Sequence, residues 1–165
     1  MLFGISPLGW VHTLGSLPAI PVAIYMFTRH GRIVPRSIPG AIYFASFLIG
    51  GVTVFVIATQ PVSYFIGAAA LALLFGGYGV GLISGLGRAG RYIETIFLSL
   101  TAFVLMVPTL KETLTRVPNG HPIVASPQSP ILIGSELCVV LTLIVGLTAQ
   151  MLHLRKRHKA VAQAT

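Results

Sequence analysis

Residues 40–86 read GAIYFASFLIGGVTVFVIATQPVSYFIGAAALALLFGGYGVGLISGL, without one acidic, basic or histidine side chain. A bilayer core of about 30 Å takes about 20 apolar residues in a helix, so this stretch is long enough to cross a membrane twice. The only break is the short polar link at Gln60 and Pro61. The stretch therefore predicts two membrane helices, at about 40–59 and 62–86, joined as a tight antiparallel hairpin.

The composition of the whole chain supports this interpretation. Of the 165 residues, 55% are hydrophobic and 8% are charged, whereas soluble domains carry about 25% charged residues. This excludes a soluble enzyme, a disordered tail and a secreted module held together by disulfides. Cys138 is the only cysteine, so no disulfide forms within one chain.

Three further apolar stretches are long enough to span a membrane, at about 8–28, 92–110 and 131–152. We therefore predict an all-α, polytopic helical bundle with five transmembrane helices, forming one domain over residues 1–165. The first stretch has no basic segment before it, and we expect it to remain in the mature protein. It contains Pro18 and Pro21, which lack the backbone donor, so a kink near mid-membrane is predicted.

The distribution of Lys and Arg predicts the orientation of the bundle. Nine of the eleven fall on one side of a five-helix arrangement: Arg29, Arg32, Arg36, Arg88, Arg91, Arg155, Lys156, Arg157 and Lys159. The other side has Lys111 and Arg116, in an outer-face loop at 111–130. The positive-inside rule then places the N-terminus outside and the C-terminus in the cytoplasm.

The net charge of +8 is thus interpreted as an orientation signal, and we expect no nucleic-acid partner. The basic cytoplasmic tail at 153–165 is expected to attract anionic lipid.

Two ionisable side chains are expected inside the membrane near its outer surface. His12 lies about one turn inside the first helix, and Glu136 lies at a similar depth in the last. Either both face the interior and touch, or each extends separately to the interface. Ser16 shares a helix face with His12, beside carbonyls that the prolines leave free. These side chains would line a small polar cavity, with helix packing around the kink as the alternative.

Glu94 follows Arg91 by three residues, near the cytoplasmic end of the predicted helix 92–110. We expect a local charge pair between them and a favourable place for the carboxylate in the first helical turn. A cation or proton site is the alternative.

Gly77, Gly81 and Gly85 recur every four residues. This spacing predicts a helix face that packs closely against another helix, within the chain or between copies.

No metal site, cofactor or catalytic residue is predicted, because the sequence has no HExxH, CxxC or paired-carboxylate motif. His30 and His153 both lie near the predicted cytoplasmic boundary. Haem held by both, between the first and last helices, is an alternative to two interfacial histidines.

The segments HTLGSLPA at 12–19 and PRSIPGAIY at 35–43 carry a family resemblance. They resemble a group of small predicted bacterial membrane proteins of uncharacterised function. That group has a membrane-embedded His in the first helix and an H-R-x-x-G-x-x-[YF] signature opening the second. The positions that carry the resemblance are His12, Gly15, Arg36, Gly40 and Tyr43.

Pro35 stands where that signature has its histidine. A cofactor role based on a pair of histidines therefore does not transfer to His12. The resemblance implies a compact, multi-pass helical bundle in the plasma (inner) membrane of a bacterium, and it implies no reaction.

The leading functional prediction is a non-catalytic accessory or assembly subunit of a membrane complex. Few ionisable residues lie in the spans, glycines line a helix face, and little of the chain lies outside the bilayer. Its expected partners are lipid and either other membrane subunits or further copies of itself. The alternatives are a redox protein that binds haem or quinone, and a small-solute or proton transporter that uses His12 and Glu136.

Overall fold

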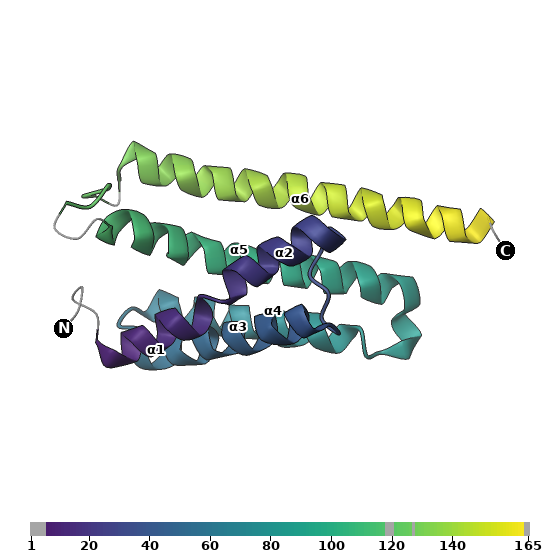
Figure 1. Cartoon of the computed structure of the whole chain (residues 1–165), viewed down its shortest axis with the longest axis horizontal. Coiled ribbons are helices and arrows are strands. Elements are labelled where there is room, and N and C mark those ends of the chain that lie inside the picture. The colour runs from purple at the N-terminus through teal and green to yellow at the C-terminus, as the bar shows by residue number, and fades with distance from the viewer. Residues whose placement is uncertain (1–5, 118–120, 127, 164–165) are drawn as a thin grey trace.

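The chain is helical, with no strand in the part that the structure describes (Figure 1). The computed structural model describes residues 6–117, 121–126 and 128–163, with side chains as far as Lys156. The elements are α1 (Pro7–Ser16), α2 (Ala19–His30), α3 (Ile38–Ile57), α4 (Pro61–Val80), the 3₁₀ helix η2 (Ser84–Leu86), α5 (Gly87–Arg116) and α6 (Pro130–Gln163). Five helices are long and apolar enough to cross a membrane, counting α1 and α2 together as the first. The predicted all-α class with five such helices is confirmed.

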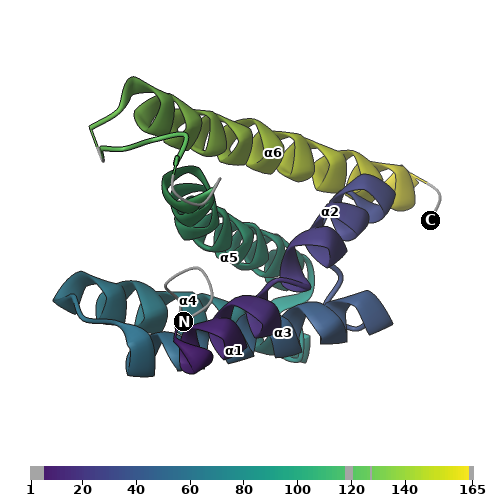
Figure 2. The ribbon, with the colours of Figure 1, turned by 60° about the vertical axis from the view of Figure 1, so that its left-hand side comes forward.

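The kink predicted in the first helix is also confirmed. α1 ends at Ser16 and α2 begins at Ala19, and Pro18 between them has no backbone N–H to continue the ladder. The break changes the partners of the two pieces: α1 packs on α3, whereas α2 packs on both α3 and α5. In Figure 2, α2 leads from the layer of α1 and α3 toward the C-terminal half of α6.

The hairpin of α3 and α4 forms as predicted, but α4 is shorter than expected. It ends at Val80, six residues before the predicted end at 86, and the chain then turns through η2. Four glycines lie between 76 and 81, and glycine favours a helix less than alanine by about 1 kcal/mol per residue. The apolar run therefore continues to residue 86, whereas the helix ends at Val80.

The last two helices are longer than predicted. α5 begins five residues before 92 and continues to Arg116, and α6 continues to Gln163. The segments predicted as the loop 111–130 and the tail 153–165 are therefore partly helical; 118–120, 127 and 164–165 lie outside the described residues. An apolar run sets the length of a span, but a helix can continue into water beyond it. After α5 the chain folds back, and Val124 N–H donates to the Leu114 carbonyl at 3.0 Å.

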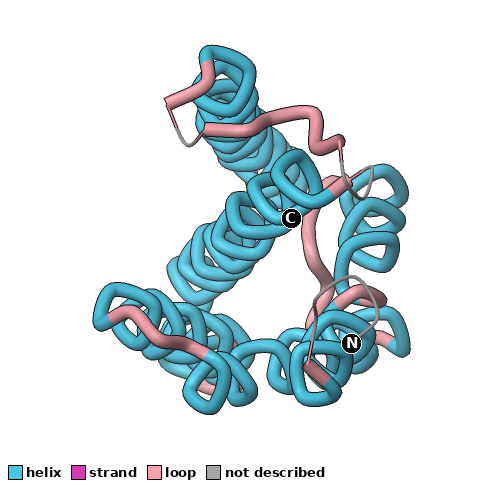
Figure 3. The backbone as a smooth tube through the Cα atoms, turned by 90° about the vertical axis from the view of Figure 1, so that its left-hand side faces the viewer, coloured by secondary structure: helices cyan, strands magenta, loops and turns pink. Residues whose placement is uncertain are grey.

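α5 lies between two unequal groups of helices. α1, α3 and α4 lie on one side of it and α6 on the other, as the end view in Figure 3 shows. The buried core comes from α2, α3, α4, α5 and the loop after α2, and it comprises Ala19, Ala23, Met26, Ile33, Tyr43, Phe47, Ala70, Leu74 and Leu98. Within it, Tyr43 of α3 and Thr101 of α5 share a buried hydrogen bond of 2.9 Å. None of the α6 side chains that the structure describes, up to Lys156, belongs to this core.

Candidate functional site: a charged cluster beside a cavity

Glu94 of α5 lies at the centre of a charged cluster. Only 4% of its side chain is exposed. Its Oε1 accepts a hydrogen bond from Arg32 Nη1 at 2.7 Å, and its Oε2 accepts one from Arg36 Nη1 at 2.9 Å. Both carboxylate oxygens thus receive charged donors, which offsets the cost of removing the carboxylate from water. We call Arg32, Arg36 and Glu94 the arginine–glutamate cluster.

The two arginines come from the loop that joins α2 to α3. Gly31 ends α2 with φ of 70°, a left-handed conformation that glycine adopts readily. Ile33 and Pro35 lie between the two arginines and are buried. The buried pair fixes the loop over α5, so that Arg32 and Arg36 reach Glu94.

The end of α4 completes the surroundings of the cluster. Arg36 Nη2 donates to the Tyr78 carbonyl at 3.3 Å, and the Tyr78 hydroxyl donates to the Gly40 carbonyl at 2.6 Å. A methyl group on Gly81 would overlap the Glu94 carboxylate and the Arg36 guanidinium. The absence of a side chain at this position is therefore a condition for the ion pairs.

The predicted Arg91–Glu94 pair is wrong. Glu94 pairs with Arg32 and Arg36, which lie about sixty residues away in the sequence. α5 also begins at Gly87 rather than near 92, so Glu94 lies about two turns inside the helix instead of in its first turn. Sequence spacing identified the nearest cation, whereas the folded loop supplied two others.

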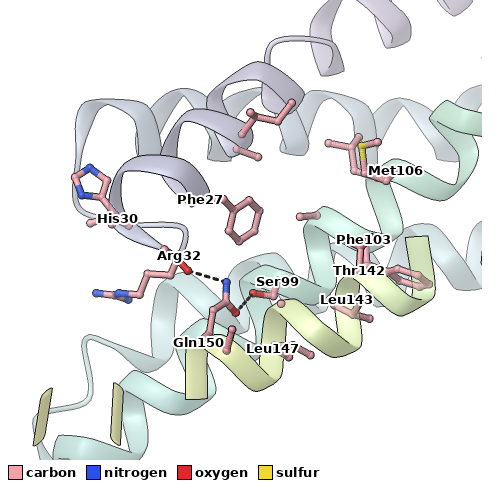
Figure 4. Close-up of a pocket in the computed structure, with 18 of the residues that line it drawn as sticks. Phe27, His30, Arg32, Ser99, Phe103, Met106, Thr142, Leu143, Leu147 and Gln150 are labelled. Carbon is pink, nitrogen blue, oxygen red and sulfur yellow. Dashed lines mark hydrogen bonds between the residues drawn. The ribbon is translucent and has the colours of Figure 1, made fainter. Parts of the chain in front are cut away.

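A partly open cavity of about 960 Å³ lies beside the cluster, between α2, α5 and α6. Its walls are mainly apolar, with Phe27 from α2, Phe103 and Met106 from α5, and Leu143 and Leu147 from α6. In Figure 4 the Phe27 ring points into the space between the helices. Apart from Thr142, the polar lining residues gather toward the C-terminal end of α2: Arg29, His30, Arg32, Ser99, Gln150 and His153.

Gln150 joins three parts of the chain at this polar end. Its Oε1 accepts a hydrogen bond from Ser99 Oγ of α5 at 2.8 Å, and its Nε2 donates to the Gly31 carbonyl at 2.9 Å (Figure 4). Arg29 and Arg32 also line the cavity, and no carboxylate does. The cavity is therefore amphiphilic, with an apolar length and a cationic end.

The structure does not bring His12 and Glu136 together. His12 Nδ1 hydrogen-bonds to Thr53 Oγ1 of α3 at 2.8 Å. Glu136 lies half-buried in α6 and has no ion pair among the described residues. The predicted contact fails because the break at Pro18 leaves α1 on α3, while α6 packs on α5. Ser16 donates to the carbonyl of Thr13 in its own helix, at 3.2 Å, and lies against Gly50 of α3.

The three glycines predicted to form one packing stripe have different surroundings. Gly77 lies against Leu98 of α5, as close helix packing requires. Gly81 follows the end of α4 beside the arginine–glutamate cluster, and Gly85 lies in η2 with no neighbouring atom within 4 Å of its added Cβ position. The stripe is wrong beyond Gly77 because α4 ends before the other two.

His30 and His153, the two weak haem candidates, both line the cavity between α2, α5 and α6. The His30 ring also packs edge-on against Tyr25, with the ring centroids 6.3 Å apart. No group of three or more His, Cys, Asp or Glu side chains arranged to hold a metal ion occurs within the described part of the chain.

Sequence reasoning missed Arg32, Ser99 and Gln150 as site residues. The sequence marks Arg32 only as an orientation signal, since any loop arginine fits that role. Gln150 could have been identified as a candidate site residue from the sequence, because it is the only amide side chain in the predicted span 131–152. Polar side chains are costly inside a membrane and usually face a partner, so Gln150 warranted the attention given to Glu136.

The residues that carry the family resemblance have clear structural places. Arg36 belongs to the arginine–glutamate cluster, Gly40 is buried against the carbonyls of Val34 and Pro35, and Tyr43 is in the core. Three residues separate Arg36 from Gly40, one more than in the signature.

No protein-family model matches the chain, and no curated protein or solved structure matches it.

Proposed function

We propose that this chain is a non-catalytic integral membrane protein that holds an amphiphilic molecule of the bilayer between α2, α5 and α6. The cavity at this place carries the proposal. Its volume of about 960 Å³ is at the upper end of the range of small-molecule sites, roughly 300–1,000 Å³.

The shape and chemistry of the cavity favour an elongated amphiphile. The lining of α6 runs from Val139 to Leu154, which corresponds to roughly 20 Å along a helix axis. Apolar side chains cover most of this length, whereas Arg29, Arg32 and Gln150 lie at one end. A molecule with an apolar tail and a polar or anionic head matches both parts.

The predicted orientation of the chain in the membrane supports an amphiphile as the occupant of this cavity. Arg29 and Arg32 lie on the side predicted to be cytoplasmic, so the cationic end of the cavity would lie at the level of the lipid headgroups. The apolar length would then lie in the hydrocarbon layer. An amphiphile could enter sideways from one leaflet without leaving the membrane.

A membrane helix of another protein is the competing occupant, and it would make the chain an accessory subunit. Such a helix would face Arg29 with no carboxylate from the cavity wall, whereas Arg32 is already paired with Glu94. An amphiphile with a polar head requires no matching carboxylate, and the charge distribution therefore favours it.

Two glycines of α6 provide a matched test. Gly146 lines the cavity, Gly134 does not, and no neighbouring atom lies within 4 Å of the added Cβ position at either residue. Gly146→Leu should fill the cavity, and Gly134→Leu should leave it open. The full chain is purified in a neutral detergent, and bound molecules are identified by extraction and mass spectrometry. We expect an amphiphile in the wild type and in Gly134→Leu that is largely lost from Gly146→Leu.

The other outcomes contradict the proposal. The absence of a co-purifying amphiphile, or its equal loss from both variants, would overturn it. A co-purifying membrane protein lost only from Gly146→Leu would favour the accessory-subunit function instead. A Soret absorbance band would assign the cavity to haem, with His30 and His153 as candidate ligands.

A further inference from the structure

A second, smaller cavity of about 310 Å³ lies where the loop between α2 and α3 meets the turn between α4 and α5. Arg32 and Arg36 come from the loop, and Arg91 and Glu94 come from α5. The rest of the lining is Val80, Gly81, Ile83, Ser84, Gly87 and Gly90. Arg32 alone of these residues also lines the larger cavity.

The charge of this small cavity is positive. Three guanidinium groups and one carboxylate line it, and three positive charges less one negative charge leave +2. The carboxylate is also the least accessible of the paired groups: 4% of the Glu94 side chain is exposed, against 23% for Arg32 and 48% for Arg36. A ligand in the cavity would therefore meet mainly cationic surface.

The arginines keep hydrogen-bond donors that the protein does not use. A guanidinium carries five N–H donors. Arg32 uses Nη1 on Glu94, whereas Arg36 uses Nη1 on Glu94 and Nη2 on Tyr78. The Arg36 side chain is 48% exposed. No buried side-chain nitrogen or oxygen of the less exposed described residues, Arg32 among them, lacks a partner, so the unused donors of both arginines are not buried without one. Arg91 forms no ion pair within the described part of the chain.

The geometry leads us to propose that this cavity binds a phosphate group. Arg91 and the unused donors of Arg32 and Arg36 would hold its oxygens, because guanidinium forks match the geometry of phosphate. Glu94 would not touch the ligand; it positions the two arginines. Glycines at 81, 87 and 90 keep the cavity free of side chains.

Arg32 lines both cavities, but Arg36 and Arg91 line only the smaller one, so this site can be tested separately from the amphiphile proposed above. A free phosphate ion and the headgroup of a phospholipid offer the same chemistry, and the experiment separates these two sources. Binding to the full chain in neutral detergent is measured by calorimetry at fixed salt, with inorganic phosphate as one probe and dioctanoyl phosphatidic acid as the other.

Two arginines in the first turns of α5 form a matched pair of variants. Both are exposed, but Arg91 lines the cavity and Arg88 does not. We expect saturable binding of at least one probe to the wild type. Arg91→Gln should weaken that binding by about 10- to 100-fold, because it removes a charge-assisted hydrogen bond to the phosphate. Arg88→Gln should bind like the wild type.

Each outcome bears on the inference. Binding of inorganic phosphate would identify the free ion as a ligand, and binding of dioctanoyl phosphatidic acid alone would identify a lipid headgroup. No saturable binding of either probe, or equal weakening by both arginine variants, would overturn the site. Gly146→Leu should leave binding intact. If Gly146→Leu abolishes binding and Arg91→Gln does not, the probe occupies the larger cavity, and the phosphate site is wrong while the proposed function remains.

Discussion

The two sides of α5 differ in how they are held together. Toward α3 and α4, the contacts include the buried Tyr43–Thr101 hydrogen bond, Gly77 against Leu98, and the arginine–glutamate cluster. Toward α6, the contacts include the hydrogen bonds of Gln150 with Ser99 and with the Gly31 carbonyl, at the polar end of the partly open cavity. In the most apolar part of each span, 33% of the residues are buried in α3 and 6% in α6.

This difference is the one expected if the five apolar helices pack against one another in lipid. Lipid tails are as apolar as leucine, so apolar side chains alone do not bring two helices into contact. Small residues and polar contacts decide the packing, and in this chain they are concentrated on the side of α3 and α4. α6 has an apolar surface with few such contacts, which leaves room for the cavity beside it.

The largest expected effect comes from breaking the cluster on the well-packed side. Glu94→Gln removes the charge that Arg32 and Arg36 share, and we expect a loss of about 2–3 kcal/mol in the free energy of unfolding. This is at the lower end for a buried pair, because both arginines are partly exposed. Unfolding by denaturant in detergent micelles measures it.

Glu136→Gln is the control for this substitution on the α6 side. Glu136 is half-buried and has no ion pair among the described residues. Its replacement should change the unfolding free energy by less than about 0.5 kcal/mol. Equal losses in the two variants would contradict the contrast between the two sides of α5.

A smaller effect is expected at the glycine beside the cluster. Gly81→Ala places a methyl group where the Glu94 and Arg36 side chains meet, and it should cost about 1–2 kcal/mol as these groups move apart. Gly85→Ala is the control, because the added Cβ position has no neighbour within 4 Å. Thermal unfolding compares the two variants, and a destabilisation by Gly85→Ala as large as that by Gly81→Ala would argue against the steric explanation.

The smallest effect is expected where α6 is attached. Gln150→Leu removes hydrogen bonds to Ser99 and to the Gly31 carbonyl. Hydrogen bonds between membrane helices are worth about 0.6 kcal/mol each, so a loss of about 1 kcal/mol is expected. Hydrogen exchange followed by mass spectrometry should then increase in α6 and stay unchanged in α3. Increases of similar size in both helices would mean that α6 is not separately attached.

The sequence alone determined the number of helices long and apolar enough to span a membrane, the hairpin at Gln60 and Pro61, and the break at Pro18. These features depend on local properties: the length of an apolar run, and the donor that proline lacks. The ends of α4, α5 and α6 were less predictable, because glycines ended α4 inside an apolar run and the other two helices continue beyond theirs.

Only the tertiary structure decided which side chains meet. Arg32 and Arg36 with Glu94, His12 with Thr53, and Gln150 with Ser99 and Gly31 come from distant parts of the chain. In a membrane, lipid and protein neighbours are both apolar, so the pattern of apolar residues does not tell which face of a helix packs inward. Each pair depends on the rotation of one helix against another and on the path of the loops between them. The spans are therefore set locally, whereas the charged cluster and the two cavities exist only once the helices are packed.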